Sequence, residues 1–317
     1  MNIEPYFENE QGQLYCGDCR EILWLMPENS VDCCITSPPY FGLRDYKTDG
    51  QIGLENTLDA YISKLVEVFA EVRRVLKDTG TFWLVIGDNY AGGGRDAKHS
   101  HRQSTNRGTR DMPKSTIPEG INRKETCGVP WRVAFALQND GWFIRQDIIW
   151  HKPNPMTESV SDRCTRSHEY IFLMVKQADY FFDANAIKEK AKPEHFKRYK
   201  TALWGPGTKE GLGSGRRDGK ANTGGVKPLY YMANKRSVWT VTTSNLKVKH
   251  FAIFPPALIK PMIMSGCPVG GVVLDPFMGT GTTAYVAQNA LRKWIGIEIN
   301  EASCNIARER VCQRLII

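Results

Sequence analysis

Near the start of the chain, four consecutive residues combine groups that could hold a planar amine: Ser37-Pro38-Pro39-Tyr40. They follow the short apolar run 31–35, which favours a buried strand. The prolines fix φ and remove backbone donors, so the Ser37 hydroxyl, the Pro38 carbonyl and the Tyr40 ring are held at the end of that strand. The two oxygens could accept the hydrogens of an exocyclic NH2 group while the ring stacks on its base, leaving the nitrogen able to attack an electrophile. The alternative interpretation is an ordinary proline-rich turn.

A second stretch with chemical potential lies near the other end of the chain, where a glycine turn joins a strand to a helix. It reads Asp275-Pro276-Phe277-Met278-Gly279-Thr280-Gly281-Thr282-Thr283. Glycines let the backbone approach a ligand, and the free N–H groups of a helix N-terminus can bind a carboxylate. Glu298 follows Gly279 by 19 positions, close to the spacing at which an acid at the next strand tip pairs with ribose hydroxyls. Alone, such a turn would equally suit a dinucleotide.

A third candidate is Asp18, which ends the short strand expected over 13–18. Its carboxylate could accept a hydrogen bond from the amino group of a cofactor. It could equally be the N-cap of the helix expected over 19–26, and the two roles are compatible. Cys16 and Cys19 have C-x-x-C spacing, but no second such pair lies at a suitable distance. We therefore expect no metal site.

Taken together, the two motifs resemble those of the amino-group DNA methyltransferases. Ser-Pro-Pro-Tyr at 37–40 is similar to the catalytic motif, and its serine resembles the cytosine-N4 branch, whereas Asp or Asn is more usual there in adenine-N6 enzymes. Asp-Pro-Phe-x-Gly-x-Gly-Thr-Thr at 275–283 is similar to the cofactor motif, which disfavours a nicotinamide or flavin enzyme. A catalytic corner that precedes the cofactor turn resembles the β group of this family.

The resemblance implies an α/β fold of the Rossmann-like class I S-adenosylmethionine-dependent methyltransferase type, circularly permuted, with a mixed seven-stranded sheet. It requires the strand that ends at Glu298 to lie beside the strand that ends near Asp18, so that both chain ends reach the carboxyl edge of one sheet. The expected parts are a catalytic part at 1–182 with a flexible basic insertion at 92–124, an irregular target-recognition region at 183–243, and a cofactor-binding part at 244–317.

Hydrophobic periodicity predicts the elements that position these motifs. We expect a helix over 57–77 that stops before Gly80, and then a buried strand over 81–87. A strand over 168–175 should pair antiparallel with a strand over 142–150 and close that edge of the sheet. Further helices are expected over 130–139, 257–265, 284–290 and 301–317.

The resemblance also implies the roles of individual residues. The catalytic residues would be Ser37, Pro38, Pro39 and Tyr40. The cofactor, S-adenosyl-L-methionine, would be bound by Asp18, Phe251, Asp275, Phe277, Gly279, Thr280, Gly281, Thr282 and Glu298. The target-base pocket would include Trp150, Lys152 and Asn154.

Composition is consistent with a soluble, DNA-binding enzyme. The 317 residues are 41% hydrophobic, with no apolar run long enough for a membrane span. The start of the chain lacks the basic and apolar regions of a secretion signal, and the nine cysteines, an odd number, favour reduced thiols in the cytoplasm. The net charge of +8 favours a polyanionic partner. Interleaved cations and aromatics at 183–243 indicate nucleic-acid contact or, alternatively, a solvated linker.

These observations predict a site-specific DNA methyltransferase. It would transfer a methyl group from S-adenosyl-L-methionine to N4 of cytosine in double-stranded DNA after flipping the base, as in a restriction-modification or phage system. Two alternatives remain open, an adenine-N6 methyltransferase and a catalytically silent DNA-binding module of the same fold. The chain would be a monomer or homodimer, and a cognate restriction endonuclease is left open as a partner.

Overall fold

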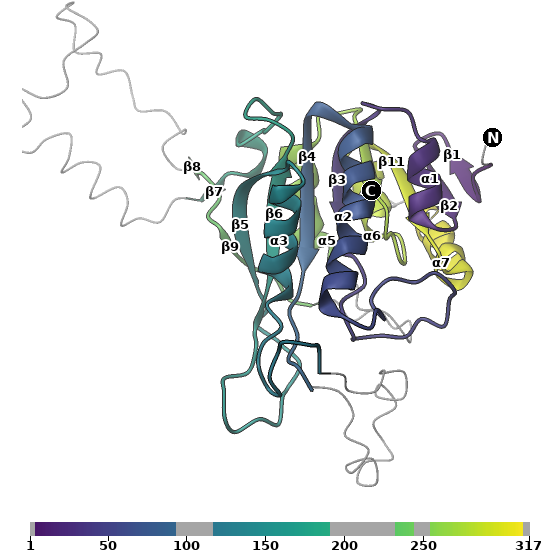
Figure 1. Cartoon of the computed structure of the whole chain (residues 1–317). Helices are drawn as coiled ribbons and strands as arrows, with labels where there is room; N and C mark the ends of the chain where they lie inside the picture. The colour runs from purple at the N-terminus through teal and green to yellow at the C-terminus, as the bar shows by residue number, and fades with distance from the viewer. Residues whose placement is uncertain (1–3, 93–116, 191–231, 244–253, 313–317) are drawn as a thin grey trace, which may run out of the picture. The chain divides into compact units, whose positions relative to one another are not determined.

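The computed structural model in Figure 1 describes residues 4–92, 117–190, 232–243 and 254–312. The chain divides into two compact units, one formed by residues 1–183 and 237–317 and the other by residues 184–236. Most of the expected basic insertion, and Phe251, lie outside the described residues. The catalytic role of residues 1–182, the target-recognition role of residues 183–243 and the cofactor-binding role of residues 244–317 stay predictions.

The larger unit is built on a single nine-stranded sheet, whereas seven strands were expected. Its order is β1 (Phe7–Asn9), β2 (Gly12–Cys16), β11 (Lys293–Glu298), β10 (Val272–Asp275), β3 (Val31–Thr36), β4 (Leu76–Ile86), β6 (His168–Val175), β5 (Phe143–His151) and β9 (Val238–Thr240). The two outermost strands, β1 and β9, have three residues each and carry no long apolar run that sequence could reveal. The sheet is mixed, as expected, because β1 and β6 run antiparallel to their neighbours.

Helices cover both faces of this sheet (Figure 1). One face carries α1 (Cys19–Leu25), α2 (Leu58–Val75) and α3 (Val129–Asn139), and the other carries α5 (Pro256–Gly266), α6 (Thr282–Asn289) and α7 (Glu301–Cys312). A strand between two helical layers must be apolar on both sides, and β3 shows this. Its Cys34 packs in the core under α2, while Cys33 and Ile35 pack in the core under α5. The double-sided burial explains the continuous apolar run before Ser37.

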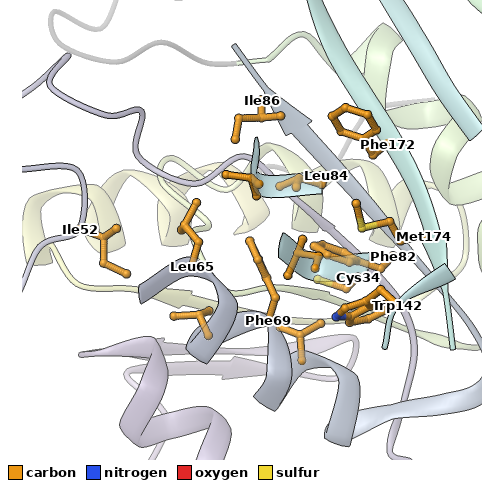
Figure 2. Close-up of a cluster of buried hydrophobic side chains, with 14 of the residues drawn as sticks. Cys34, Ile52, Leu65, Phe69, Phe82, Leu84, Ile86, Trp142, Phe172 and Met174 are labelled. Atoms are coloured by element: carbon orange, nitrogen blue, oxygen red, sulfur yellow. The ribbon is translucent and has the colours of Figure 1, made fainter. Parts of the chain in front are cut away.

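Helix α2 anchors the core on its side of the sheet. Thr57 caps its N-terminus by accepting a hydrogen bond from the Ala60 N–H at 3.1 Å. Its buried stripe includes Leu65 and Phe69, and Figure 2 shows both among the side chains of the core. The Phe69 ring lies 4.8 Å from the Phe82 ring of β4, centroid to centroid. Burying such a side chain is worth roughly 1.5–3 kcal/mol.

The predicted end of this helix was wrong. The helix ends at Val75, and strand β4 begins at once with Leu76, which pairs with Val31 of β3. Gly80 therefore lies inside a strand, where a Cβ atom would approach the Leu76 side chain to 2.6 Å. Leu76 is fully buried, so tertiary burial rather than the local glycine signal sets the boundary.

The two distant ends of the chain meet in the middle of the sheet, as expected. Strand β11 runs parallel to β2, with Glu298 opposite Cys16. The other neighbour of β11 is β10. Strand β10 in turn runs parallel to β3, with Leu274 opposite Cys34. The carboxyl ends of these four strands therefore lie at the same edge, where open α/β sheets bind ligands.

Strand β6 is antiparallel to β5, as predicted, with Ile171 opposite Ile148. It does not close the edge of the sheet, because it lies between β4 and β5, and β9 adds outside β5. The fully buried residues 171, 172, 174 and 175 explain the difference, since an edge strand would leave part of such a run exposed.

The smaller unit contains a 3-10 turn at Asn185–Ile187 and a two-stranded ladder of β7 (Glu189–Lys190) and β8 (Met232–Ala233). Within it Arg236 forms an ion pair with Glu189. In the part of the chain that is described, no helix is long and apolar enough to cross a membrane.

Candidate active site

A cavity of about 670 Å³ opens at the carboxyl edge of the sheet and is lined by both ends of the chain. Of the predicted site residues, those that line it are Asp18, Ser37, Pro38, Pro39, Tyr40, Trp150, Lys152, Asn154, Phe277, Gly279, Thr280, Thr282 and Glu298. Asp275 and Gly281 are not among its lining residues. The juxtaposition of the two sequence motifs in one cavity is the central geometric feature of the molecule.

The Ser37–Tyr40 corner is held from behind by helix α2. The Tyr61 hydroxyl donates to the Pro39 carbonyl at 2.9 Å, and a buried helix residue thus fixes the turn. Among the described residues, no backbone N–H bonds to the carbonyl of Pro38, which also lines the cavity. The Ser37 hydroxyl donates to the Tyr40 hydroxyl at 3.4 Å, a long contact for two hydroxyls. The corner thus presents two acceptors beside an aromatic ring.

Tyr40 itself is fixed through its hydroxyl, which donates to Glu169 Oε2 at 2.9 Å. Burial and the nearby Glu169 carboxylate raise the pKa of Tyr40 well above its usual value, so the phenol stays neutral. Gly87 lies against the ring, and a Cβ atom there would approach Tyr40 Cε2 to 2.7 Å. The ring can therefore serve as a fixed, uncharged stacking surface.

The glycine turn after β10 has open space beside Gly279 and a buried hydroxyl without a partner on Thr280. Gly279 adopts a left-handed φ of 53°, and no described atom lies within 4 Å of where its Cβ would be. The Thr280 Oγ1 atom is buried without a hydrogen-bond partner in the described part of the chain. A buried hydroxyl without a partner is costly, so a ligand that bonds to it would be stabilised. The turn therefore fits a bound cofactor.

Glu298 stands beside this turn with both carboxylate oxygens oriented by the backbone. Oε2 accepts from the Gly279 N–H and Oε1 from the Asn300 N–H, each at 2.8 Å. Burial raises the pKa of Glu298, and the backbone N–H groups partly offset this effect. Each carboxylate oxygen has a further lone pair. The group can therefore accept hydrogen bonds from the two hydroxyls of a ribose.

Asp275 was expected to contact the cofactor, but its surroundings indicate a different role. Its side chain is 1% exposed, and its oxygens accept from the hydroxyls of Thr36 and Thr283, each at 2.6 Å. The Phe277 N–H adds a third bond at 3.1 Å. Burial raises its pKa to about 6. Asp275 thus ties β3, the glycine turn and the start of α6 together from below the cavity.

Gly281 also faces away from the cavity, because its Cβ would lie 3.0 Å from the Ala307 Cβ of helix α7. Its φ of 79° and this close approach together require glycine. The neighbouring Thr282 lines the cavity, and its hydroxyl accepts from Arg310 at 2.8 Å. The second glycine of the motif therefore serves helix packing rather than ligand approach.

Asp18 has the first of its two predicted roles, that of a helix N-cap, and its contact with a cofactor stays a prediction. Its Oδ1 atom accepts from the Arg20 N–H at 2.9 Å, which makes it the N-cap of α1. Burial alone would raise the pKa of Asp18, but hydrogen bonds and the charge of Arg20 lower it. The same residue lines the cavity, where the Arg20 guanidinium bonds to both of its carboxylate oxygens.

The predicted base-pocket residues lie at the end of β5 and in the segment that follows it. Trp150 is held by its indole N–H, which donates to the Val241 carbonyl at 2.8 Å. The Lys152 ammonium lies 4.2 Å from the centre of the Trp150 ring and forms an ion pair with Glu169. Asn154 exchanges two hydrogen bonds with Thr243, at 3.0 and 3.1 Å.

Glu169 was not singled out from sequence, although it lines the cavity and contacts both Tyr40 of the corner and Lys152 of the predicted base pocket. A signal was present, because Glu169 is a carboxylate at the start of an otherwise apolar strand. A charged group that is largely buried normally has a hydrogen-bond or ion-pair partner. Its partners, however, come from 129 and 17 positions away in the chain.

A family model described as DNA methylase, of the N6 and N4 type, matches residues 31–309. The chain belongs to this DNA methylase family.

The relatives of this methylase match it over nearly their whole length. Type II methyltransferase M.SmaI of Serratia marcescens is 42% identical over 302 residues, covering 95% of this chain and 91% of that protein. Type II methyltransferase M.Cfr9I of Citrobacter freundii is 40% identical over 298 residues, covering 94% and 87%. The predicted family is confirmed.

Solved structures confirm the predicted fold of the methylase. PvuII DNA methyltransferase (cytosine-N4-specific) superposes with a TM-score of 0.66 at 17% identity, covering 99% of this chain and 91% of that one. A protein of Thermus thermophilus described as a DNA modification methylase, in complex with S-adenosyl-L-methionine, gives 0.56 at 22% identity, covering 94% and 92%. S-adenosyl-L-methionine is the cofactor of the family, as expected.

Proposed function

We propose that this methylase transfers a methyl group from S-adenosyl-L-methionine to N4 of cytosine at a specific site in double-stranded DNA. The observation that carries the proposal is the shared cavity, in which the Ser37–Tyr40 corner and the Phe277–Thr280 turn are both lining segments. An amine held at the corner and a methyl donor held at the turn would meet there without a further domain. Positioning of this kind can supply much of the rate of a group transfer.

The residues of the cavity divide the work between them. Glu298 would accept hydrogen bonds from the ribose of the cofactor, while Gly279 and Thr280 would face it at the turn. When bound, the cofactor supplies an electrophilic methyl group on a sulfonium. Tyr40 would stack on the target base, and the Ser37 hydroxyl and Pro38 carbonyl would hold its amino hydrogens.

This arrangement requires the target base to leave the duplex, at a cost of roughly a few kcal/mol. No strong base is needed beside it, because an amine that has gained a methyl group is acidic enough to lose a proton to a neighbour or to water. The serine at position 37 suits this mechanism, since a hydroxyl is a weak base but a competent acceptor.

Cytosine is favoured over adenine by the serine at the first position of the corner. A similarly folded protein, PvuII DNA methyltransferase, is described as cytosine-N4-specific. Adenine-N6 is the alternative, because both targets are aromatic NH2 groups that the same acceptors could hold.

We further propose that the enzyme works within a restriction-modification system in the cytoplasm. Its relatives M.SmaI and M.Cfr9I are type II methyltransferases, and the net charge of +8 favours association with DNA. The partner nuclease, the recognition sequence and the choice between monomer and homodimer stay open. DNA from cells that express the chain, read by methylome sequencing, would give the recognition sequence.

The proposal is tested by incubating the purified chain with methyl-labelled S-adenosyl-L-methionine and genomic DNA, followed by nucleoside analysis. We expect the label in N4-methylcytosine. Label in N6-methyladenine would support the alternative instead. A chain that binds the cofactor but transfers no label to any DNA would contradict the proposal and support the silent DNA-binding module.

A further inference from the structure

A chain of hydrogen bonds connects Ser37, at the proposed catalytic corner, to Glu169 on strand β6. The Ser37 hydroxyl lies 3.4 Å from the Tyr40 hydroxyl, which in turn lies 2.9 Å from Glu169 Oε2. The other carboxylate oxygen, Oε1, is paired with the Lys152 ammonium. The Glu169 carboxylate is therefore the last member of this series of hydrogen bonds, and it also connects the series to Lys152 of the predicted base pocket.

The direction of every hydrogen bond in this chain follows from the chemistry of its members. An ionised carboxylate can only accept, so the Tyr40 hydroxyl must give its single hydrogen to Glu169. The Tyr40 oxygen can then only accept from Ser37. The single hydrogen of the Ser37 hydroxyl is thereby directed to Tyr40. Ser37 is left with acceptor lone pairs, and no hydrogen, for a ligand in the cavity.

Packing leaves this network little room to rearrange. A Cβ atom at Gly87 would lie 2.7 Å from Tyr40 Cε2 and 3.3 Å from Glu169 Cδ, so the glycine admits both side chains. The side chains of Glu169 and Lys152 are only 18% and 17% exposed. The Lys152 ammonium also lies over the Trp150 ring. The carboxylate is therefore held between its partners rather than free in solvent.

We propose that Glu169 is a positioning residue for methyl transfer: it sets the direction of the hydrogen bonds so that Ser37 offers only acceptor lone pairs to the amino group of the target base. The inference rests on the proposed function and extends it to a residue that does not touch the reacting atoms. Without the carboxylate, the Tyr40 hydroxyl could donate to Ser37. The Ser37 hydrogen could then point at the amino hydrogens and repel them.

The decisive test compares Glu169→Gln with Glu169→Met. The two side chains are similar in length, but only glutamine has an oxygen that can accept from Tyr40. We expect Glu169→Met to lower kcat for methyl transfer on the order of 10²-fold, as a misplaced reacting group does. Glu169→Gln should recover most of this loss, while the Kd for S-adenosyl-L-methionine stays at the wild-type value in both. The Tm should fall in both variants, because each leaves Lys152 without its ion-pair partner. Equal losses in both variants would overturn the proposal.

A second measurement asks whether Glu169 acts through the Tyr40 hydroxyl. Tyr40→Phe keeps the stacking ring and removes only that hydroxyl. If both residues act through the same series of hydrogen bonds to Ser37, the kcat of the Tyr40→Phe/Glu169→Met double variant should be no lower than that of the worse single variant. Losses that multiply would mean that the two residues act separately, and the proposal would be wrong.

A control variant guards against general effects of removing a carboxylate. Glu71 on α2 forms an ion pair with Arg74 and is 30% exposed, and Glu71→Met should keep wild-type kcat. A wild-type chain that transfers no methyl group to DNA would refute the proposed function and this inference together. A wild-type chain that methylates DNA, with Glu169→Met equally active, would refute this inference alone.

Discussion

The two halves of the cavity present their polar groups in different ways. In the cofactor half, formed by the Phe277–Thr280 turn and Glu298, the carboxylate is fixed by two backbone N–H groups at 2.8 Å, and Asp275 braces the turn from below. In the base half, formed by the Ser37–Tyr40 corner, Trp150 and Lys152, the polar side chains of Ser37, Tyr40 and Lys152 are held by other side chains, and the Ser37–Tyr40 bond is as long as 3.4 Å.

Because of this difference, substitutions in the two halves should have different effects. Backbone groups cannot be removed by substitution, so changes in the cofactor half should alter affinity or stability. Apart from the Pro38 carbonyl, side-chain atoms define the base half, so changes there should alter the rate of transfer and leave cofactor binding intact.

The largest effect is expected in the base half. Ser37→Ala removes one of two acceptors for the amino hydrogens, and kcat should fall on the order of 10²- to 10³-fold, as for loss of a preorganised polar group. Steady-state methylation of DNA measures kcat, and isothermal titration measures the Kd for S-adenosyl-L-methionine, which should not change. If the affinity for the cofactor fell in parallel with kcat, the two halves would not be separable.

A stability effect is expected from Asp275, which braces the cofactor half. Burial raises its pKa from 3.8 to about 6, so the folded protein favours the protonated form. The associated stability is present below about pH 4 and is lost as the pH rises through about 6. Asp275→Asn keeps the shape and cannot ionise. Relative to this variant, the wild-type free energy of unfolding should fall by about 2 kcal/mol between about pH 4 and about pH 7.

Urea unfolding of both proteins across that pH range measures the difference directly. Groups that titrate elsewhere contribute equally to both proteins and cancel. A difference that stays constant with pH would mean that the pKa of Asp275 is the same in the folded and the unfolded protein, and burial would then not raise it.

A smaller effect is expected for Glu298→Gln. The amide keeps the size of the side chain but directs an NH2 group at one of the backbone donors, Gly279 or Asn300. We expect the affinity for S-adenosyl-L-methionine to fall roughly tenfold to a hundredfold, the range for hydrogen bonds to a charged group. At saturating cofactor, kcat should stay near the wild-type value. A loss of kcat with unchanged affinity would reverse the roles of the two halves.

The smallest effects separate the two glycines of the turn. Alanine at either position must adopt a left-handed φ, which costs roughly 1–2 kcal/mol. Gly281→Ala also meets Ala307 at 3.0 Å and should lose more stability, visible as a lower Tm. Gly279→Ala meets no described atom, so its additional loss should be in cofactor affinity. An equal loss of affinity in both variants would contradict the assignment of Gly281 to packing.

The features predicted well from sequence are those carried by contiguous residues. The glycine turn and the Ser37–Tyr40 corner each lie within one short segment, so their residue types are enough to indicate the fold, the family and the cofactor. The meeting of β2 with β11 followed from the need to bring these segments to one sheet edge.

The features missed depend on contacts between distant residues. Sequence cannot show that Asp275 accepts a hydrogen bond from Thr36, which lies 239 positions away. The importance of Glu169 arises from the pairing of β4 with β6, which places Tyr170 opposite Ile86 and brings Glu169 beside Gly87 and Tyr40. Likewise, the end of α2 is set by the pairing of Leu76 with Val31 rather than by Gly80.

The most direct test of the shared cavity is the structure of this methylase bound to its DNA site and a non-transferable analogue of S-adenosyl-L-methionine. We expect a cytosine outside the duplex, stacked on Tyr40, with its amino nitrogen about 3 Å from Ser37 Oγ. The analogue should lie along the Phe277–Thr280 turn with its ribose at Glu298. A base that stays stacked in the duplex, or an analogue bound away from this turn, would contradict the account.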